Sequence, residues 1–306
     1  FVSALFGIVD ENGLRQFREA VLIIGRKNGK SLLAAAIAKY IWQIEGGFGA
    51  KVYNIAPKLD QADIIYNNIW QMTLLDPNYQ ETKRMLDERD AHNRRIKDDS
   101  ELPRHRMSDL FIPAINSQVK KIAFSAKRSD GFNPSMCICD EIASWEGDAG
   151  LKQYEVMKSG MGAREEGILL SCTTAGYIND SIYDEIFKRC TRFLKGDSKE
   201  RKLLPFLYVI DDISKWNDIN ELRKSNPNLG VSVSVDFMLE EIAIAEGSLS
   251  KKAEFLTKYC NIKQNSSLAW LDAQTVERCF GEHLNIEDFA SSYCVAGIDL
   301  SQTTDL

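Results

Sequence analysis

The sequence lacks the features that mark a secreted, membrane-spanning or zinc-stabilised protein. Its seven cysteines follow no paired spacing, and the closest two, Cys137 and Cys139, alternate in an apolar run as neighbours on one strand face do. No apolar run approaches the roughly 20 residues that a membrane-spanning helix needs. The chain opens at Phe1 without the charged segment of a signal peptide. We therefore expect a reducing compartment and no membrane partner.

The chain also lacks an initiating methionine, and it ends at Leu306 directly after a strand-like run. Both features predict a fragment of a longer protein. Of its 306 residues, 44% are hydrophobic and 27% are charged, which is an ordinary globular composition with enough apolar material for a sizeable core. The length suggests about two domains.

An excess of positive charge is missing too, because the formal net charge is -6. A protein that binds nucleic acid over its whole surface is usually basic, so any contact with DNA must come from local groups of Lys and Arg. Acidic residues interleave these groups, and a solvated surface is the alternative interpretation of each. The basic groups are Lys83-Arg84, Arg94-Arg95, Arg104-His105-Arg106, Lys120-Lys121 and Lys127-Arg128.

The sequence does contain an alternation of short apolar runs and amphipathic segments. The first run, residues 21–24, precedes a glycine-containing loop and an Ala- and Leu-rich segment over residues 32–44. The same order recurs at residues 51–55 and 60–75, which predicts an α/β fold with a mostly parallel sheet and flanking helices. Further strands are expected at residues 119–125, 135–140, 168–172 and 203–210.

Composition divides the chain into regions. Residues 1–210 carry the alternating pattern, whereas residues 211–263 change texture and predict a small helical linker subdomain. Residues 264–306 begin with a polar linker and end with a strand-like run that starts another domain. Residues 80–106 are dense in charge and poor in apolar side chains, so we expect a mobile or solvated insertion there. The helices expected in the linker subdomain cover residues 219–223, 236–245 and 250–260.

The loop after the first strand has the composition of a phosphate-binding loop. A strand, a glycine-containing loop and a helix present backbone N–H groups and a helix N-terminus to an anion. Lys30 would then contact the β- and γ-phosphates of a nucleotide, and Ser31 would bind Mg²⁺. The pattern is imperfect, because Ile24 stands where the first glycine usually lies, and a basic turn is the alternative interpretation. The candidate ATP-binding residues are Gly25, Arg26, Lys27, Asn28, Gly29, Lys30 and Ser31.

Two acidic residues follow the most apolar of the predicted strands. Asp140 and Glu141 lie at its carboxyl end, which is where parallel sheets bind ligands. Asp140 would hold Mg²⁺, and Glu141 would orient and activate the attacking water. A solvated acidic turn is the alternative. The glutamate favours hydrolysis of ATP with conversion to work, and the sequence contains no Asn-Lys-x-Asp motif of the kind by which small GTPases read the base.

In this order, the motifs resemble those of the large terminase subunit of tailed double-stranded DNA bacteriophages. The strongest match is the loop from Gly25 to Ser31, and the resemblance extends over nearly the whole chain. It implies a P-loop ATPase domain, a helical linker subdomain and the start of an RNase H-like nuclease domain. The other matching segments are Leu5-Phe6-Gly7, Gly13 to Ala20, Ala56-Pro57-Lys58 with Gln61-Ala62, Asp130 to Pro134, and Thr173-Thr174-Ala175-Gly176.

The resemblance implies further roles around the nucleotide. Arg26 would contact the γ-phosphate as a sensing or catalytic arginine, and a solvated loop cation is the alternative. The segment from Thr173 to Gly176 would couple hydrolysis to domain movement, against the alternative of a strand-end turn. Arg128 would act in trans on the ATP of a neighbouring subunit. Lys127, or an arginine within residues 80–106, is the alternative for that role.

The family also carries a nuclease that cuts DNA with two metal ions, Mg²⁺ or Mn²⁺, held by carboxylates. The run from Val295 to Leu300 resembles its first strand, and Asp299 matches its first metal-binding aspartate. An Asp among apolar residues of a strand needs a partner or a metal, and an Asp that caps a turn is the alternative. Asp305 is a weaker companion. The other carboxylates would lie beyond Leu306, so this chain is not expected to cut DNA unaided.

The implied protein is an ATP-driven motor that moves double-stranded viral DNA into a procapsid and carries a metal-dependent endonuclease. Its expected partners are duplex DNA, the portal of the procapsid, a small terminase subunit and further copies of itself in a ring, with a monomer in solution left open. Its expected location is the host cytoplasm during phage assembly. A helicase or translocase of the related ATPase group and a slow nucleotide-gated assembly switch are the alternatives.

Overall fold

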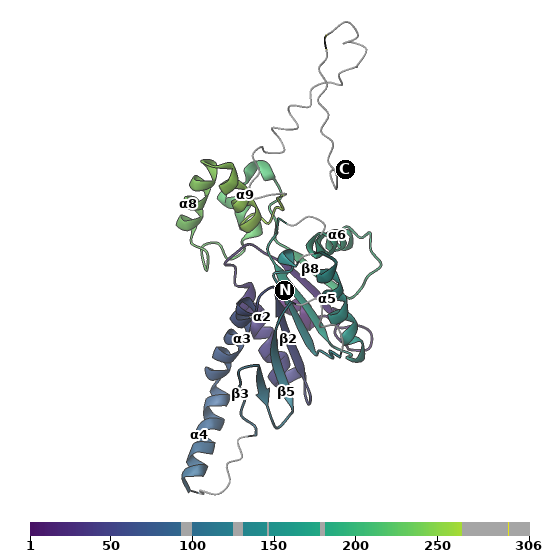
Figure 1. The fold of residues 1–306 in the computed structure, drawn as a ribbon, viewed down its shortest axis with the longest axis vertical. Coiled ribbons are helices and arrows are strands. Elements are labelled where there is room, and N and C mark those ends of the chain that lie inside the picture. The colour runs from purple at the N-terminus through teal and green to yellow at the C-terminus, as the bar shows by residue number, and fades with distance from the viewer. Residues whose placement is uncertain (93–99, 125–130, 146, 178–180, 265–292, 294–306) are drawn as a thin grey trace. The chain divides into compact units, whose positions relative to one another are not determined.

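The computed structural model of the chain describes residues 1–92, 100–124, 131–145, 147–177, 181–264 and 293. Contacts divide the chain into two units, Phe1–Leu268 and Ala269–Leu306. The helices and strands described below all belong to the first unit. It contains a central sheet, helices on both faces of the sheet, and a separate group of helices that follows in the chain (Figure 1).

The sheet has eight strands among the described residues, in the order β3-β4-β5-β2-β6-β7-β1-β8. The strands from β5 across to β8 are parallel, whereas β4 pairs antiparallel with β5, and β3 with β4. The predicted mostly parallel sheet is therefore confirmed. The strands are β1 (Glu19–Ile23), β2 (Lys51–Ala56), β3 (Arg104–His105), β4 (Asp109–Ile112), β5 (Ser117–Ala123), β6 (Met136–Asp140), β7 (Ile168–Thr173) and β8 (Leu203–Leu207).

The two helices predicted after the first two strands are present. The first, α2 (Lys30–Tyr40), begins inside the candidate phosphate loop and continues as a π-helical turn, Ile41–Glu45, up to Gly46. The second is α3 (Leu59–Leu74). The remaining helices are α1 (Val2–Gly7), α4 (Pro77–His92), α5 (Gly147–Gly160), α6 (Ile182–Leu194), α7 (Ile219–Ser225), α8 (Val235–Glu246) and α9 (Leu249–Lys258).

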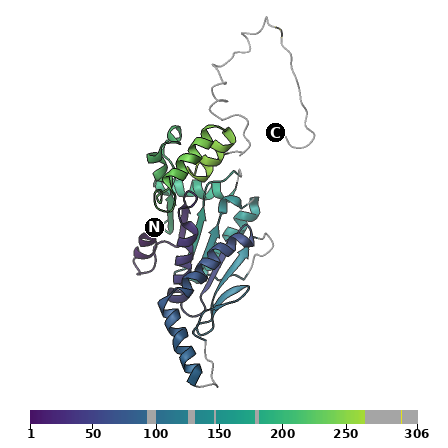
Figure 2. The same cartoon turned by 90° about the vertical axis from the view of Figure 1, so that its left-hand side faces the viewer.

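The charged stretch over residues 80–106 is not simply an insertion without secondary structure. Helix α4 covers its first part and projects away from the sheet (Figure 2). Its residues are good helix formers, and Arg84 forms an (i, i+4) ion pair with Glu88 at 3.8 Å. The sequence pattern did not predict this helix, because polar side chains surround it and leave no apolar periodicity.

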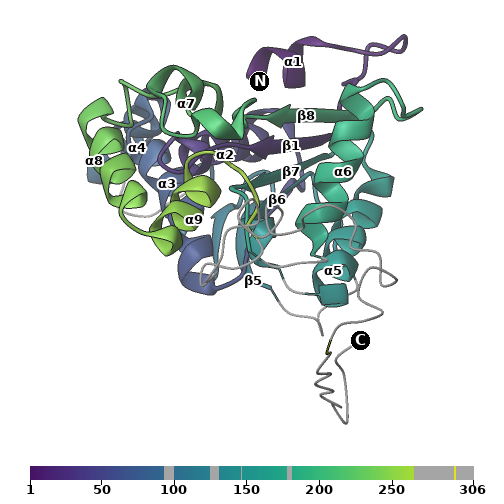
Figure 3. The same ribbon diagram turned by 90° about the horizontal axis from the view of Figure 1, so that it is seen from above.

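Apolar side chains pack on both faces of the sheet. Leu22 of β1 belongs to one buried cluster, which contains residues of α2 and α3, whereas Val21 and Ile23 belong to a second, which contains residues of α5 and α6. This alternation follows from the two-residue period of a strand. Cys137 and Cys139 lie on the second face with their sulfurs 4.0 Å apart, as their spacing predicts. Figure 3 shows the sheet edge-on between these two pairs of helices.

The helices after β8 have a core of their own, as predicted for a helical linker subdomain. Its buried side chains include Trp216, Leu222, Met238 and Phe255, which come from α7, α8, α9 and the turn before α7. The three helices match the predicted segments to within a few residues at each end. We refer to residues 211–263 as the helical subdomain.

Strand register gathers the candidate site at one edge of the sheet. Residue Ile23 of β1 pairs with Thr173 of β7, and Asp140 of β6 pairs with Cys172 of β7. The carboxyl ends of three adjacent parallel strands therefore meet there. The phosphate loop, the acidic residues and the candidate coupling segment each begin where one of these strands ends.

Candidate nucleotide site

The phosphate loop joins β1 directly to α2. Gly29 precedes the helix with φ of +81°, a left-handed conformation that glycine adopts without strain, and Lys27 also has positive φ, at +65°. Leu33 N–H donates to the Gly29 carbonyl at 3.0 Å, which closes the first helical turn. The first N–H groups of an α-helix have no partner within the helix, so this geometry suits a bound phosphate.

Lys30 and Glu141 lie side by side although one follows β1 and the other follows β6. The Lys30 Nζ is 2.9 Å from Glu141 Oε1, and the two side chains are 12% and 23% exposed. The fold thus brings together the lysine predicted to contact phosphate and the glutamate predicted to activate water. A largely buried pair of this kind depends on both partners, because either charge alone would be costly to bury.

Asp140 is buried beside this ion pair. One of its carboxylate oxygens accepts a hydrogen bond from the Glu141 N–H at 3.1 Å, and its carbonyl accepts one from the Trp145 indole at 3.0 Å. Burial and the negative charge of Glu141 raise the pKa of Asp140 to about 7, while Lys30 opposes the rise. A nearby cation would favour the ionised carboxylate, so the site is chemically suited to a divalent metal.

The acidic turn itself is strained. Glu141 has φ of +52° and ψ of +45°, which is an uncommon left-handed conformation for a residue other than glycine. Its N–H also donates to the Cys172 carbonyl at 2.8 Å, so neighbouring strand β7 holds the turn in place. The left-handed residue ends β6 abruptly and directs the Glu141 side chain to Lys30. Strain of this kind is often retained at functional sites.

The residues present fit an Mg²⁺ that is shared with a nucleotide. Among the described residues, no group of three or more His, Cys, Asp and Glu side chains could hold a metal by itself. Mg²⁺ usually takes only one or two protein ligands and completes its octahedron with phosphate oxygens and water. Ser31 in the first turn of α2 and the buried Asp140 are suitable ligands of that type.

The candidate coupling segment contacts both halves of the site. The Thr173 carbonyl accepts a hydrogen bond from the Ile24 N–H at 3.2 Å, and its hydroxyl accepts one from the Ala143 N–H at 3.2 Å. The N–H of Ala175 donates to Asn261 Oδ1 at 3.2 Å, which links the segment to the chain after α9. The segment therefore touches the start of the phosphate loop, the acidic turn and the helical subdomain. Its coupling role stays a prediction.

The structure gives less information on the other predicted residues. Arg26 is exposed in the phosphate loop, and its N–H donates to the Lys258 carbonyl at 2.9 Å. Arg128, Lys127, Asp299 and Asp305 lie outside the described residues. Their proposed roles stay predictions.

Two asparagines that the sequence analysis did not single out also reach the site. Asn226, at the end of α7, contacts the phosphate loop, and Asn261 contacts the coupling segment. The available signal was an Asn-Pro-Asn turn at residues 226–228, since such a turn ends a helix and fixes the chain that follows. It gave no indication of the partner, because the contact joins positions far apart in the sequence.

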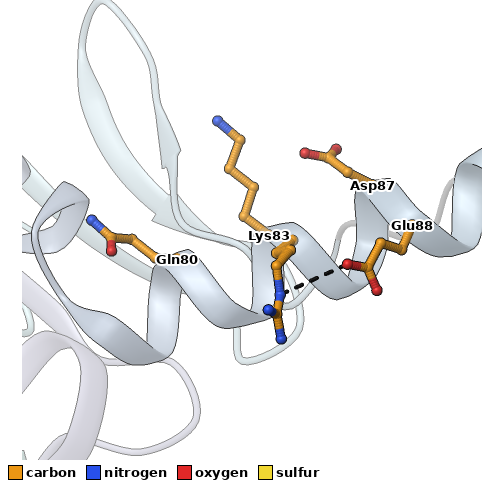
Figure 4. Close-up of a pocket in the computed structure, with 5 residues that line it drawn as sticks. Gln80, Lys83, Asp87 and Glu88 are labelled. Atoms are coloured by element: carbon orange, nitrogen blue, oxygen red, sulfur yellow. Dashed lines mark ion pairs between the residues drawn. The ribbon is translucent and has the colours of Figure 1, made fainter.

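A separate hollow of about 520 Å³ lies along α4. Its lining side chains come from this one helix, and Figure 4 shows them arranged along the helix with the Arg84–Glu88 ion pair between them. The lining residues are Gln80, Lys83, Arg84, Asp87 and Glu88. Basic and acidic side chains together on one exposed helix face form a solvated surface and not an enclosed ligand site.

Within the described residues, none of the helices has the length and apolar character of a membrane span.

Comparisons with known proteins give a consistent result. A family model described as the terminase large subunit, ATPase domain, matches residues 1–192, and one described as the terminase large subunit, endonuclease domain, matches residues 199–306. The second match begins before the predicted linker subdomain. The boundaries at residues 210 and 263 therefore stay predictions.

This chain covers only part of the length of each relative described here. Protein YmfN of Escherichia coli (strain K12) is 30% identical over 181 residues, which is 59% of this chain and 39% of YmfN. The crystal structure of the HK97 bacteriophage large terminase is 20% identical with a TM-score of 0.67, over 86% of this chain and 49% of that chain. The chain thus spans half or less of the length of these relatives, and the structural likeness shows a shared fold.

Proposed function

The chain belongs to the family of terminase large subunits, and from this premise we propose that it hydrolyses ATP as part of a motor that moves double-stranded viral DNA into a procapsid. One observation carries the ATPase proposal. Lys30 and Glu141 form a 2.9 Å ion pair at the sheet edge where Asp140 is also buried. A cation for the phosphates, a carboxylate for the water and a carboxylate for the metal are the groups that ATP hydrolysis needs.

Each of these residues has one role in the reaction. Lys30 and the N–H groups at the start of α2 bind the β- and γ-phosphates, and Arg26 adds positive charge at the γ-phosphate. Ser31 and Asp140 would hold Mg²⁺, which would supply positive charge to neutralise the phosphates. Glu141 orients the attacking water and accepts its proton. Because phosphate oxygens compete with Glu141 for Lys30, binding of ATP frees the carboxylate for the water.

The conversion of hydrolysis to movement needs contacts outside the phosphate site. The segment from Thr173 to Gly176 is proposed to transmit it, and its hydrogen bonds to the phosphate loop, the acidic turn and Asn261 support this role. Arg128 is proposed to act on the ATP of a neighbouring subunit. A trans-acting arginine requires an assembly of several copies, so the working form would be a ring on the capsid.

The match to the terminase endonuclease domain supports a second activity in the complete protein. Asp299 is proposed as a ligand of Mg²⁺ or Mn²⁺ in the nuclease, which cuts the DNA. The partners of the complete protein would be duplex DNA, the portal of the procapsid and a small terminase subunit. Assembly of phage particles would place the complex in the host cytoplasm.

Plasmid cleavage and ATP hydrolysis by the complete polypeptide test these proposals together. Wild type should hydrolyse ATP and cleave plasmid DNA in Mg²⁺ or Mn²⁺, and Asp299→Asn should lose cleavage while it keeps ATP hydrolysis. Cleavage by wild type that is unchanged in the variant would remove Asp299 from the nuclease. Strand separation without cleavage would favour a helicase, and slow hydrolysis unaffected by DNA would favour an assembly switch.

A further inference from the structure

The side chain of Asn28 lies inside the fold and does not point to solvent. It is 5% exposed, and its Nδ2 lies 3.0 Å from both the Gly25 and Arg26 carbonyls and 2.9 Å from Asn226 Oδ1. The first two contacts close the loop on itself. The third connects the loop to the helical subdomain.

The orientation of the Asn226 amide is fixed by its own surroundings. Its Nδ2 donates to the Tyr259 carbonyl at 2.7 Å and to the Leu222 carbonyl at 3.0 Å, and the side chain is fully buried. A flipped amide would place its oxygen against these two carbonyls, so the oxygen must face Asn28. Asn226 therefore joins the ends of α7 and α9 to the phosphate loop through a fully used amide.

Asn228, two residues later, completes the contact. Its N–H donates to Asn28 Oδ1 and its Nδ2 donates to the Asn28 carbonyl, each at 3.0 Å. The Ser232 hydroxyl donates to the Lys27 carbonyl at 2.7 Å. In addition, the N–H of Gly25 donates to the Ser225 carbonyl at 3.1 Å. The subdomain thus contacts the loop at several successive residues and has Asn28 at the centre of the contact.

The contact also explains why residue 25 is a glycine. A Cβ at residue 25 would lie 2.2 Å from Asn226 Oδ1 and 3.1 Å from the Ser225 carbonyl. Gly25 has no positive φ, so its backbone conformation does not require glycine. Its glycine is required because the helical subdomain approaches the loop closely at this residue.

We propose that Asn226 is a positioning residue for ATP binding, which acts through Asn28 to hold the phosphate loop in its binding conformation. The inference rests on the proposed ATPase function. Phosphate binding needs several loop N–H groups aimed at one point, and a preorganised loop binds more tightly than one that must be ordered. Because Asn226 belongs to the helical subdomain, docking of that subdomain and affinity for ATP favour each other, as linkage requires.

Calorimetric titration of the full chain with Mg²⁺ and ADP tests the proposal. Asn226→Ala should weaken ADP binding by about fivefold to tenfold, because the loop loses its contact through Asn28 and must then be ordered when the nucleotide binds. Asn28→Ala should give a similar loss. The double variant should bind ADP no more weakly than the weaker single variant, because Asn226 acts on the loop through Asn28 and has no effect on affinity once that side chain is gone. In steady-state assays the KM for ATP should rise, with a smaller change in kcat.

Met238→Ala is the matched control, since Met238 is fully buried in the core of the same subdomain and outside the contact with the loop. It should lower Tm and leave the dissociation constant for ADP unchanged. If Asn226→Ala does not fold, Asn228→Ala removes one contact from a half-buried position and should weaken binding about twofold to fivefold.

The outcomes separate this inference from the proposed function. No ADP binding by wild type would remove the ATPase proposal itself. Wild-type binding together with unchanged affinity in Asn28→Ala, Asn226→Ala and Asn228→Ala would overturn the positioning role alone. Additive losses in the double variant would also overturn it, because they would show that the two residues act independently.

Discussion

The ammonium of Lys30 lies 2.9 Å from the Glu141 carboxylate and holds together two segments that follow different strands. The ion pair lies where phosphate and water must meet if ATP is hydrolysed. Phosphate oxygens of a bound nucleotide would compete with the Glu141 carboxylate for the three donors of the Lys30 ammonium. We therefore expect ATP to weaken this ion pair, which would leave the Glu141 carboxylate beside the γ-phosphate.

Glu141→Gln should separate nucleotide binding from turnover. The amide keeps the size of the side chain but cannot accept a proton, so ATP hydrolysis should fall by at least about 100-fold. Binding of Mg²⁺ and ADP should stay the same or tighten, because Lys30 no longer has a carboxylate partner. Release of phosphate and calorimetric titration measure the two properties. Glu155→Gln, on an exposed position of α5, is the control and should leave both unchanged. Normal turnover in Glu141→Gln would contradict the assignment.

Asn261 should affect the coupling segment through its side chain and its backbone separately. It is buried with φ of +56°, accepts from the Ala175 N–H and donates to the Tyr208 carbonyl at 2.7 Å. Asn261→Gly removes the amide but tolerates the backbone, whereas Asn261→Ala also adds the strain of a left-handed alanine. In denaturant titrations, we expect the free energy of unfolding of Asn261→Ala to be about 1 kcal/mol lower than that of Asn261→Gly.

The same pair of variants tests the coupling role. If Asn261 links the segment to the helical subdomain, Asn261→Gly should hydrolyse ATP near the wild-type rate but lose stimulation by DNA and procapsid. Equal stimulation in wild type and Asn261→Gly would leave Asn261 with a structural role only.

How much of this could be read from the sequence depends on the range of the interaction. The phosphate loop was predictable because its strand, loop and helix are adjacent in the chain. The acidic turn was predictable because the carboxyl ends of parallel strands meet at one edge of the sheet, which places Asp140 near Lys30. Helix α4 was missed because a helix that is polar all round has no periodic pattern. The Asn28–Asn226 contact joins residues separated by 198 positions, and no local pattern encodes it.

Glu19 should make stability depend on acid pH. It is buried at the start of β1, where it accepts from the Tyr154 hydroxyl at 2.6 Å and from Arg189 at 2.8 Å, with Lys158 at 3.1 Å. Burial alone would raise the pKa of Glu19, but Arg189, Tyr154 and Lys158 together hold it below the usual value of 4.5. A carboxylate with a lowered pKa stabilises the fold above its unfolded pKa, and this stability is lost as pH falls below about 4.5.

The corresponding measurement is the free energy of unfolding as a function of pH. Arg189→Met should destabilise the fold at pH 7 by about 3 kcal/mol, because it leaves a buried carboxylate without its main partner. Glu19→Gln with Arg189→Met should be more stable at pH 7 than Arg189→Met alone. Because it lacks the Glu19 carboxylate, its free energy of unfolding should fall less steeply in acid than that of the wild type. ADP affinity should not change, since Glu19 lies at the end of β1 away from the phosphate loop. A steeper fall of the free energy of unfolding in acid for the double variant than for the wild type would contradict this explanation.

Gly25→Ala tests the close approach between the phosphate loop and the helical subdomain. The new Cβ would lie 2.2 Å from Asn226 Oδ1, which no folded protein tolerates without movement. We expect a lower Tm and weaker ADP binding, because the loop must shift away from Asn226 or the subdomain must move.

Adding Asn226→Ala removes the clashing oxygen, so the double variant should recover part of the Tm lost in Gly25→Ala. Recovery should be incomplete, since the Ser225 carbonyl remains 3.1 Å from the Cβ. If Asn226→Ala lowers Tm equally with and without Gly25→Ala, the two residues do not meet in solution, and the glycine serves the loop backbone instead.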